Sequence, residues 1–277
     1  MIDLNKIKKD AVFAPIIVIH GQPGVGKTTF ACDAEKPIVI MTERGLGNIS
    51  VAAIPTDENG KPRVATSFKE VLEFFAALGE QEHDFKTVII DSLDSLEPLV
   101  WDATCKRLGC ASIEAPGWGK GYREATNVEW KQFFDCVSAM GDYKNMTVIM
   151  IAHSTFTHID DPERPAYDTV TLNLHKYIAP VIVEKADVVG YAAQKVYTKV
   201  DDTAKKDEKR VRAVGVVERE LRVSISPAFT AKTRYPEMPT VLPLDYDEFK
   251  KYLPGYAGET AKEEAKPEEK KSKKKGE

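Results

Sequence analysis

Short apolar runs recur along the first 154 residues, and each of them ends at glycine or at a polar residue. The runs are continuous rather than alternating, which is typical of strands that a parallel sheet buries on both faces. They lie at 15–19, 37–41, 87–92 and 147–154. Apolar residues from Phe68 to Leu78 recur at helical spacing after a capping box that begins at Ser67. The pattern predicts an α/β fold with a mostly parallel central sheet flanked by helices.

The rest of the pattern adds helices and then an antiparallel β extension. Further helices are predicted at 27–34, 93–108, 128–140 and 174–186. A strand opens at 187–191, and two β-rich runs at 195–200 and 211–217 flank a charged segment, which predicts a hairpin. A short strand at 222–226 and a short helix at 245–253 complete the predicted fold.

The turn after the first strand matches G-x-x-x-x-G-K-[ST], the phosphate-binding P-loop. Its residues are Gly21, Gln22, Pro23, Gly24, Val25, Gly26, Lys27 and Thr28, and Thr29 follows them. Glycines allow successive backbone N–H groups to point at one anion. In such a loop Lys27 reaches the β- and γ-phosphates, the Thr28 hydroxyl holds Mg²⁺ and Thr29 lies toward the α-phosphate. Because the match joins a buried strand to a helix, we prefer a nucleotide site to a plain glycine turn.

Polar side chains stand where the other three apolar runs end. Asp91 fits the Walker B role, in which a carboxylate joins the Mg²⁺ shell, partly through water. Because Ser92 rather than glutamate follows it, the role of orienting the attacking water falls to Glu43; the alternative is an exposed acid that opens a loop. His153 could sense the γ-phosphate and pass its state to a predicted loop at 155–172, or it is a hydrogen-bonded strand-end histidine.

A glycine-rich segment after the third run interleaves aromatic and basic residues, namely Trp118, Lys120, Tyr122 and Arg123. Aromatic rings stack on bases and cations meet phosphates, so this segment is a candidate contact for single-stranded DNA. The alternative is a surface loop whose Trp118 folds back onto the core.

Composition sets limits on these interpretations. The chain has 277 residues, 43% hydrophobic and 30% charged, with a net charge of −4, so it can bury a full core but has no global basic field. No apolar run approaches the ~20 residues of a membrane span, and the N-terminus lacks an apolar signal core. We therefore expect a cytoplasmic protein, in the host cell if a phage encodes it, with no membrane partner.

The cysteines and histidines predict neither disulfides nor a zinc site. The four cysteines form no C-x-x-C pair, which favours reduced thiols. A zinc site is rejected because no candidate ligand pair has the usual spacing; the candidates are His153, His158 and His175 with Cys105 or Cys110. We expect an N-terminal extension at 1–11, one domain at 12–256 and a disordered charged tail at 257–277.

The order of these parts resembles the RecA-like ATPase superfamily. More closely, it is similar to phage-encoded AAA-domain nucleotide-binding proteins, among them the RecA-like single-strand annealing ATPases of the Sak type. The segments that carry the resemblance are GQPGVGKTTFA, the acid that closes the next strand, GWGKGY, KADVVGY and AKTRYPEMP.

The resemblance implies roles for particular residues. Glu43 matches the catalytic glutamate, and His153 stands where relatives carry a polar sensor. Lys232 and Arg234 match a Lys-x-Arg element that acts across a subunit interface on the neighbour's γ-phosphate, which implies self-assembly. Their other interpretation is an exposed basic hairpin. The loops after Asp91 and after His153 match loops that face DNA.

The function expected from the sequence is therefore binding and hydrolysis of Mg-ATP by a RecA-like protein that acts on single-stranded DNA. The context would be phage recombination, annealing or replication, with DNA-stimulated turnover and a phage single-strand-binding protein as a further partner. The alternatives are a DnaB-like motor or loader, and a nucleotide-gated scaffold that recruits proteins with little turnover. The preference for ATP rests on the resemblance.

Overall fold

The computed structural model describes residues 13–45, 52–163, 165–200 and 211–255, without the side chains of 196–200 and 211–217. The predicted N-terminal extension, the turn of the predicted hairpin and the charged tail lie outside the described residues. The strands are β1 (Ile16–Gly21), β2 (Pro37–Met41), β3 (Thr87–Asp91), β4 (Thr147–Ile159), β5 (Tyr167–Leu172), β6 (Val188–Val200), β7 (Val211–Arg222), β8 (Lys232–Thr233) and β9 (Val241–Pro243). The helices are α1 (Lys27–Cys32), α2 (Phe68–Glu80), α3 (Leu93–Leu108), α4 (Lys120–Ala125), a π-helical turn (Thr126–Trp130), α5 (Lys131–Lys144), α6 (Ala179–Lys185) and α7 (Tyr246–Lys250).

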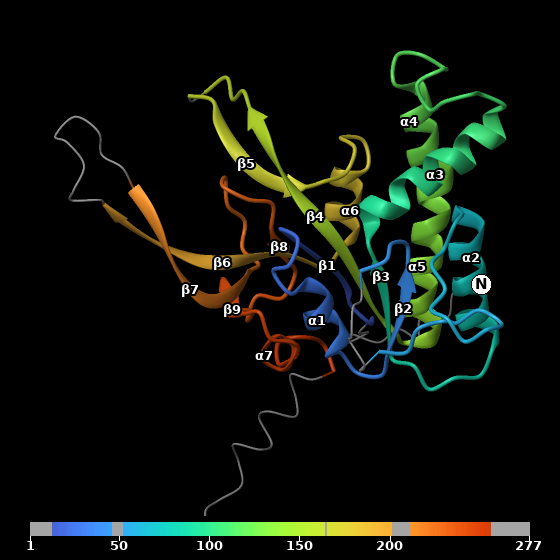
Figure 1. Cartoon of the computed structure of the whole chain (residues 1–277), viewed down its shortest axis with the longest axis horizontal. Helices are drawn as coiled ribbons and strands as arrows, with labels where there is room; N and C mark the ends of the chain where they lie inside the picture. The colour runs from blue at the N-terminus through green and yellow to red at the C-terminus, as the bar shows by residue number, and fades with distance from the viewer. Residues whose placement is uncertain (1–12, 46–51, 164, 201–210, 256–277) are drawn as a thin grey trace, which may run out of the picture.

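The centre of the molecule is a sheet in the order β2-β3-β4-β1-β6-β7-β9, in which β5 pairs with β4 and β8 pairs with β6. The strands from β2 to β6 in this order run parallel, so their carboxyl ends meet at one edge. Ligands of open α/β sheets bind at this edge. Figure 1 shows these strands side by side. The polar residues that close the predicted strands are brought together at this edge by the parallel pairing.

Alternate residues of the central strands face two separate hydrophobic cores. Val18 packs into the core beneath α2, α3 and α5, whereas Ile17 and Ile19 pack into the core beneath α1 and α7 (Figure 1). All three side chains are fully buried. Burial on both faces explains why the strands are continuous apolar runs. The predicted fold class, a mostly parallel sheet with flanking helices, is confirmed.

The predicted antiparallel extension is also confirmed. β6 and β7 pair antiparallel, and β9 continues the same sheet beyond β7. The two expected strands at 187–191 and 195–200 are one strand, because β6 continues through an irregularity between Gln194 and Val196. The strand expected at 222–226 is not formed, apart from Arg222 at the end of β7.

The loop expected at 155–172 is a second hairpin. β4 continues past His153 to Ile159 and pairs antiparallel with β5, with Ser154 opposite Leu172. Threonine, valine and aromatic residues in both arms favour strands. The hairpin rises above the carboxyl edge of the sheet (Figure 1).

No described helix is long and apolar enough to cross a bilayer.

Candidate active site

The loop between β1 and α1 has the backbone of an anion-binding turn. Gly24 and Gly26 have positive φ angles of 77° and 108°, which residues with a side chain rarely adopt. Gly21 lies so close to β6 that a Cβ there would be 2.4 Å from the carbonyl oxygen of Ala192. Gly24 and Gly26 are therefore needed for their backbone conformation, and Gly21 is needed for its close approach to β6.

Lys27 is buried and curls back over this loop. Its Nζ donates to the carbonyl oxygens of Gly21 at 2.9 Å and of Gln22 at 3.1 Å. Burial lowers the pKa of Lys27, and the nearby carboxylates, Asp94 foremost, oppose that shift. A cation held this way offers its charge to an anion that enters the loop.

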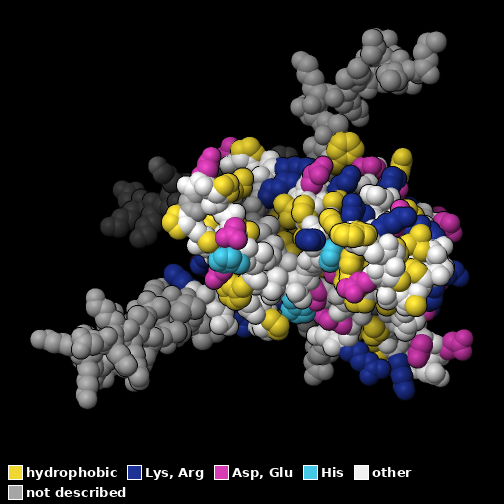
Figure 2. Space-filling view, turned by 90° about the horizontal axis from the view of Figure 1, so that it is seen from above, with side chains coloured by type: hydrophobic (Ala, Val, Ile, Leu, Met, Phe, Trp, Pro, Cys, Tyr) yellow, Lys and Arg dark blue, Asp and Glu magenta, His cyan; other side chains and the backbone are white. Residues whose placement is uncertain are grey.

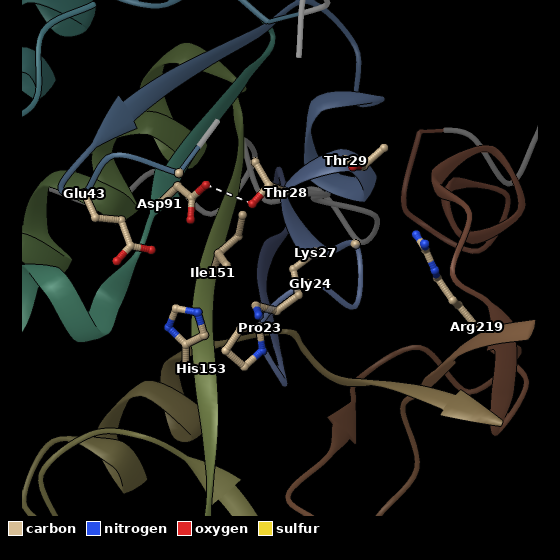
Figure 3. A pocket seen from close by; sticks show the side chains of 12 residues that line it. Pro23, Gly24, Lys27, Thr28, Thr29, Glu43, Asp91, Ile151, His153 and Arg219 are labelled. Carbon is tan, nitrogen blue, oxygen red and sulfur yellow. Dashed lines mark hydrogen bonds between the residues drawn. The ribbon is translucent and has the colours of Figure 1, made fainter. Parts of the chain in front are cut away.

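Thr28 and Asp91 bring a hydroxyl and a carboxylate together. The Thr28 Oγ1 donates to Asp91 Oδ2 at 2.9 Å (Figure 3). Burial raises the pKa of Asp91, while the Thr28 hydrogen bond lowers it. Mg²⁺ prefers such hard oxygen ligands, and a cation here would offset the cost of burying the carboxylate. This pair therefore fits the predicted Mg²⁺ site.

The first turn of α3 orients both Glu43 and His153. Ser95 Oγ donates to Glu43 Oε2 at 2.6 Å. Asp94 accepts the backbone N–H of His153 at 2.8 Å, and its other oxygen lies 2.5 Å from His153 Nδ1. Sequence reasoning missed Asp94 and Ser95, although their place directly after the Walker B strand is a usable signal. Through these bonds Glu43 and His153 are held toward one cavity.

The cavity has a volume of about 390 Å³ and opens at the carboxyl edge of the sheet (Figure 3). Its lining residues are Pro23, Gly24, Gly26, Lys27, Thr28, Thr29, Glu43, Gly45, Asp91, Ile151, His153 and Arg219. The structure thus brings together the predicted phosphate-binding, metal-binding and water-orienting residues. It adds Arg219 of β7, which sequence reasoning missed because no motif marks it.

Lys232 and Arg234 are not brought to this cavity in their own chain. Lys232 Nζ donates to three carbonyl oxygens at the end of α6, those of Val183, Glu184 and Ala186. Arg234 donates to the Asp187 carboxylate and to the Glu184 carbonyl, both at 2.8 Å. Both side chains lie where β6 begins, at the amino edge of the sheet, whereas the cavity lies at the carboxyl edge.

The rings of Trp118 and Tyr122, the candidate base-stacking residues, differ in how much of their surface is free. Trp118 is 97% exposed, so its ring does not fold back onto the core. Tyr122 lies in α4 rather than in a loop, and its ring stacks on His175 with centroids 3.9 Å apart. One face of Tyr122 is therefore already covered.

Lys120 and Arg123, the two candidate DNA-binding cations, both lie at the surface. Arg123 donates to the Trp118 carbonyl oxygen at 2.6 Å and lies over the ring of Tyr177. Lys176 also lies over that ring, so the loop before α6 adds a basic residue to the surface that carries Lys120. On the described surface seen from above the sheet edge, basic side chains alternate with acidic and apolar ones rather than forming one basic field (Figure 2).

Glu97 connects α3, whose first turn orients Glu43 and His153, to the candidate DNA surface. It lies on α3 one turn after Asp94, is buried, and accepts the backbone N–H of His175, the residue that stacks on Tyr122. Burial raises the pKa of Glu97 from its usual 4.5 to about 7; the His175 hydrogen bond opposes the rise and the Asp94 carboxylate adds to it. Glu97 therefore carries a proton in the folded state at mildly acidic pH.

Glu97→Gln should flatten the dependence of stability on pH. In the unfolded chain Glu97 ionises near 4.5 and in the folded chain near 7, so stability is greatest below that window and falls as the pH rises through it. Each unit of pKa shift corresponds to about 1.4 kcal/mol, so the total loss is up to about 3 kcal/mol. Urea unfolding at pH 5 and pH 8 measures it, with the exposed Glu73→Gln as control. An unchanged pH dependence in Glu97→Gln would contradict the assignment.

Comparison with known proteins gives a family. The model of a family described as AAA domain matches residues 14–235. Among solved structures, the crystal structure of the RadB recombinase matches at 14% identity, covering 73% of this chain and 87% of that chain, with a TM-score of 0.38. That likeness is too slight to carry an argument about activity. The comparison with curated proteins finds no match.

Proposed function

The chain belongs to the AAA domain family and is a nucleotide-binding ATPase domain, and from this premise we propose that it hydrolyses Mg-ATP in the cavity at the P-loop. One observation carries the proposal. Thr28 and Asp91, joined by a hydrogen bond of 2.9 Å, line the same cavity as Lys27 and Glu43, so metal ligands, phosphate cation and candidate base share one cavity. No small-molecule acceptor site is needed to use this set, which favours hydrolysis over a kinase reaction.

The proposed mechanism assigns one task to each functional residue of the cavity. Lys27 leaves its two backbone partners to bind the β- and γ-phosphates, and the loop N–H groups surround the β-phosphate. Glu43, held by Ser95, orients the attacking water and accepts its proton. His153, held by Asp94, donates to or senses the γ-phosphate. Thr28 and Asp91 would hold Mg²⁺, which would neutralise charge that develops on the phosphate oxygens.

The proposed assembly uses Arg234 from a neighbouring subunit. Its side chain is 51% exposed although it pairs with Asp187, so a neighbour's phosphate could compete for it. Lys232 is different, because all three of its donors are used at the end of α6. We therefore infer that Lys232 positions the Arg234 segment and that Arg234 is the trans-acting cation.

We propose that ATP hydrolysis drives an action on single-stranded DNA. The process would be recombination, annealing or replication of the phage type that the sequence resembles. The support is the exposed ring of Trp118 among Lys120, Arg123 and Lys176, on a surface joined to the cavity through α3. A protruding aromatic ring with surrounding cations is suited to unpaired bases.

ATP hydrolysis should be stimulated by single-stranded DNA and should rise per subunit with protein concentration.

Trp118→Ala should weaken DNA binding about tenfold or more, because stacking of a base on an aromatic ring contributes roughly 1–3 kcal/mol. Fluorescence anisotropy at low salt measures it, with Tyr143→Ala, another strongly exposed ring, as the matched control.

Absence of DNA binding with and without nucleotide would remove the DNA role. Directional unwinding would favour a motor, and ATP-dependent assembly with almost no turnover would favour a scaffold.

A further inference from the structure

One wall of the cavity carries a cation that the proposed reaction does not use. Arg219 lies on β7, and a Cβ built on Gly26 would be 2.8 Å from its Nη1, so its guanidinium lies directly against the P-loop. The acids on either side of it in the strand are already paired, Glu218 with Lys195 and Glu220 with Arg222. Within the described part of the chain, no carboxylate pairs with Arg219. The guanidinium is therefore available to an anion in the cavity.

The position of Arg219 tells which end of a nucleotide it would meet. Glu43, Asp91 and His153 lie on one side of Lys27, and Arg219 lies on the opposite side, beyond Thr29 (Figure 3). Water attacks the γ-phosphate, so the water-orienting and metal-binding residues mark the γ-phosphate end. Arg219 consequently faces the opposite end, where the α-phosphate joins the nucleoside.

A second hollow has Arg219 in its lining, as the cavity does, and it offers a place for the nucleoside. It has a volume of about 400 Å³ and is bounded by β6, β7 and β9, with the exposed Val241 and Pro243 supplying apolar surface and Glu218 and Glu220 supplying carboxylates. An apolar wall suits the face of a base, and carboxylate oxygens accept hydrogen bonds from base amino groups or ribose hydroxyls.

We propose that Arg219 binds the nucleoside monophosphate end of the nucleotide, with its guanidinium on the α-phosphate and the nucleoside in the hollow between β7 and β9. This inference rests on the proposed nucleotide site and adds to it a residue in the same chain. A planar guanidinium can donate two hydrogen bonds to phosphate while its face packs against a ring. Because ADP and ATP share this end, Arg219 should contribute equally to the binding of both.

The experiment measures the dissociation constants of Mg-ADP and Mg-ATP for the full chain by titration calorimetry. Arg219→Ala should weaken both by about ten- to a hundredfold, as expected for loss of a hydrogen bond to a charged group, and leave their ratio unchanged. Steady-state hydrolysis should show a raised KM with an unaltered kcat, because the lost contact is equal in ground state and transition state. Arg63→Ala, which removes a surface arginine paired with Glu70, is the matched control.

Arg219→Gln provides the same test if Arg219→Ala fails to fold, because glutamine keeps the first carbons of the side chain and a polar end while removing the charge. Loss of ATP affinity alone, with a lower kcat, would place Arg219 at the γ-phosphate and overturn the inference. Unchanged affinity for both nucleotides in a folded variant would also overturn it. If the unaltered chain binds neither nucleotide, the proposed function itself fails and this inference fails with it.

Discussion

Lys27→Ala should abolish ATP hydrolysis and weaken nucleotide binding by at least about a hundredfold. Among the described residues that line the cavity, Lys27 is the only lysine, and hydrogen bonds to charged groups contribute roughly 1.5–3 kcal/mol each. Its two present partners are backbone carbonyl oxygens of the P-loop, which a phosphate can replace without leaving a carboxylate unpaired. Release of phosphate from ATP and calorimetric titration with ATP measure the two effects.

Lys69→Ala provides the matched control, because Lys69 is exposed on α2 and pairs with Glu73 at the surface. The unfolding midpoint in urea checks that Lys27→Ala is folded. Normal hydrolysis by folded Lys27→Ala would exclude the P-loop as the site of the reaction.

Glu43→Gln should bind ATP normally but hydrolyse it about 10²- to 10⁴-fold more slowly, the range in which general bases contribute to catalysis. Glutamine keeps the shape of the side chain and can still accept the Ser95 hydrogen bond of 2.6 Å, but it cannot take a proton from water. Single-turnover hydrolysis together with a binding titration separates the two effects. A small fall in rate with intact binding would assign the base role to another group.

Mixing Glu43→Gln with Arg234→Ala tests the proposed trans action of Arg234. In a mixed assembly some interfaces combine the intact Glu43 of one variant with the intact Arg234 of the other, so part of the activity should return. A mixture of two folded, co-assembled variants that stays inactive would show that Arg234 does not act across the interface.

The sequence by itself determined the parts of this protein that depend on residues close together along the chain. Continuous apolar runs predicted the buried parallel strands, because burial on both faces requires apolar side chains at every position. The P-loop could be predicted because its glycine backbone, lysine and threonine are contiguous from Gly21 to Thr28. Strand ends then indicated that Glu43, Asp91 and His153 would meet, since parallel strands share one carboxyl edge.

The same local reasoning was wrong where strand pairing decides the structure. β4 continues into a hairpin instead of a loop, since β5 supplies the hydrogen-bond partners that its outer residues need. The segment after Gly119 is the helix α4 rather than a loop, and its Tyr122 packs against His175 of a distant loop.

Only the tertiary structure decided which residues support the site from a distance. Arg219 reaches Gly26 because β6 pairs with β1 on one side and with β7 on the other, an order that no apolar run encodes. Lys232 is bound at the end of α6 because β8 pairs with the start of β6. Hydrophobic periodicity depends on neighbours along the chain, whereas these contacts depend on which strands lie side by side, and that is settled only when the whole sheet packs.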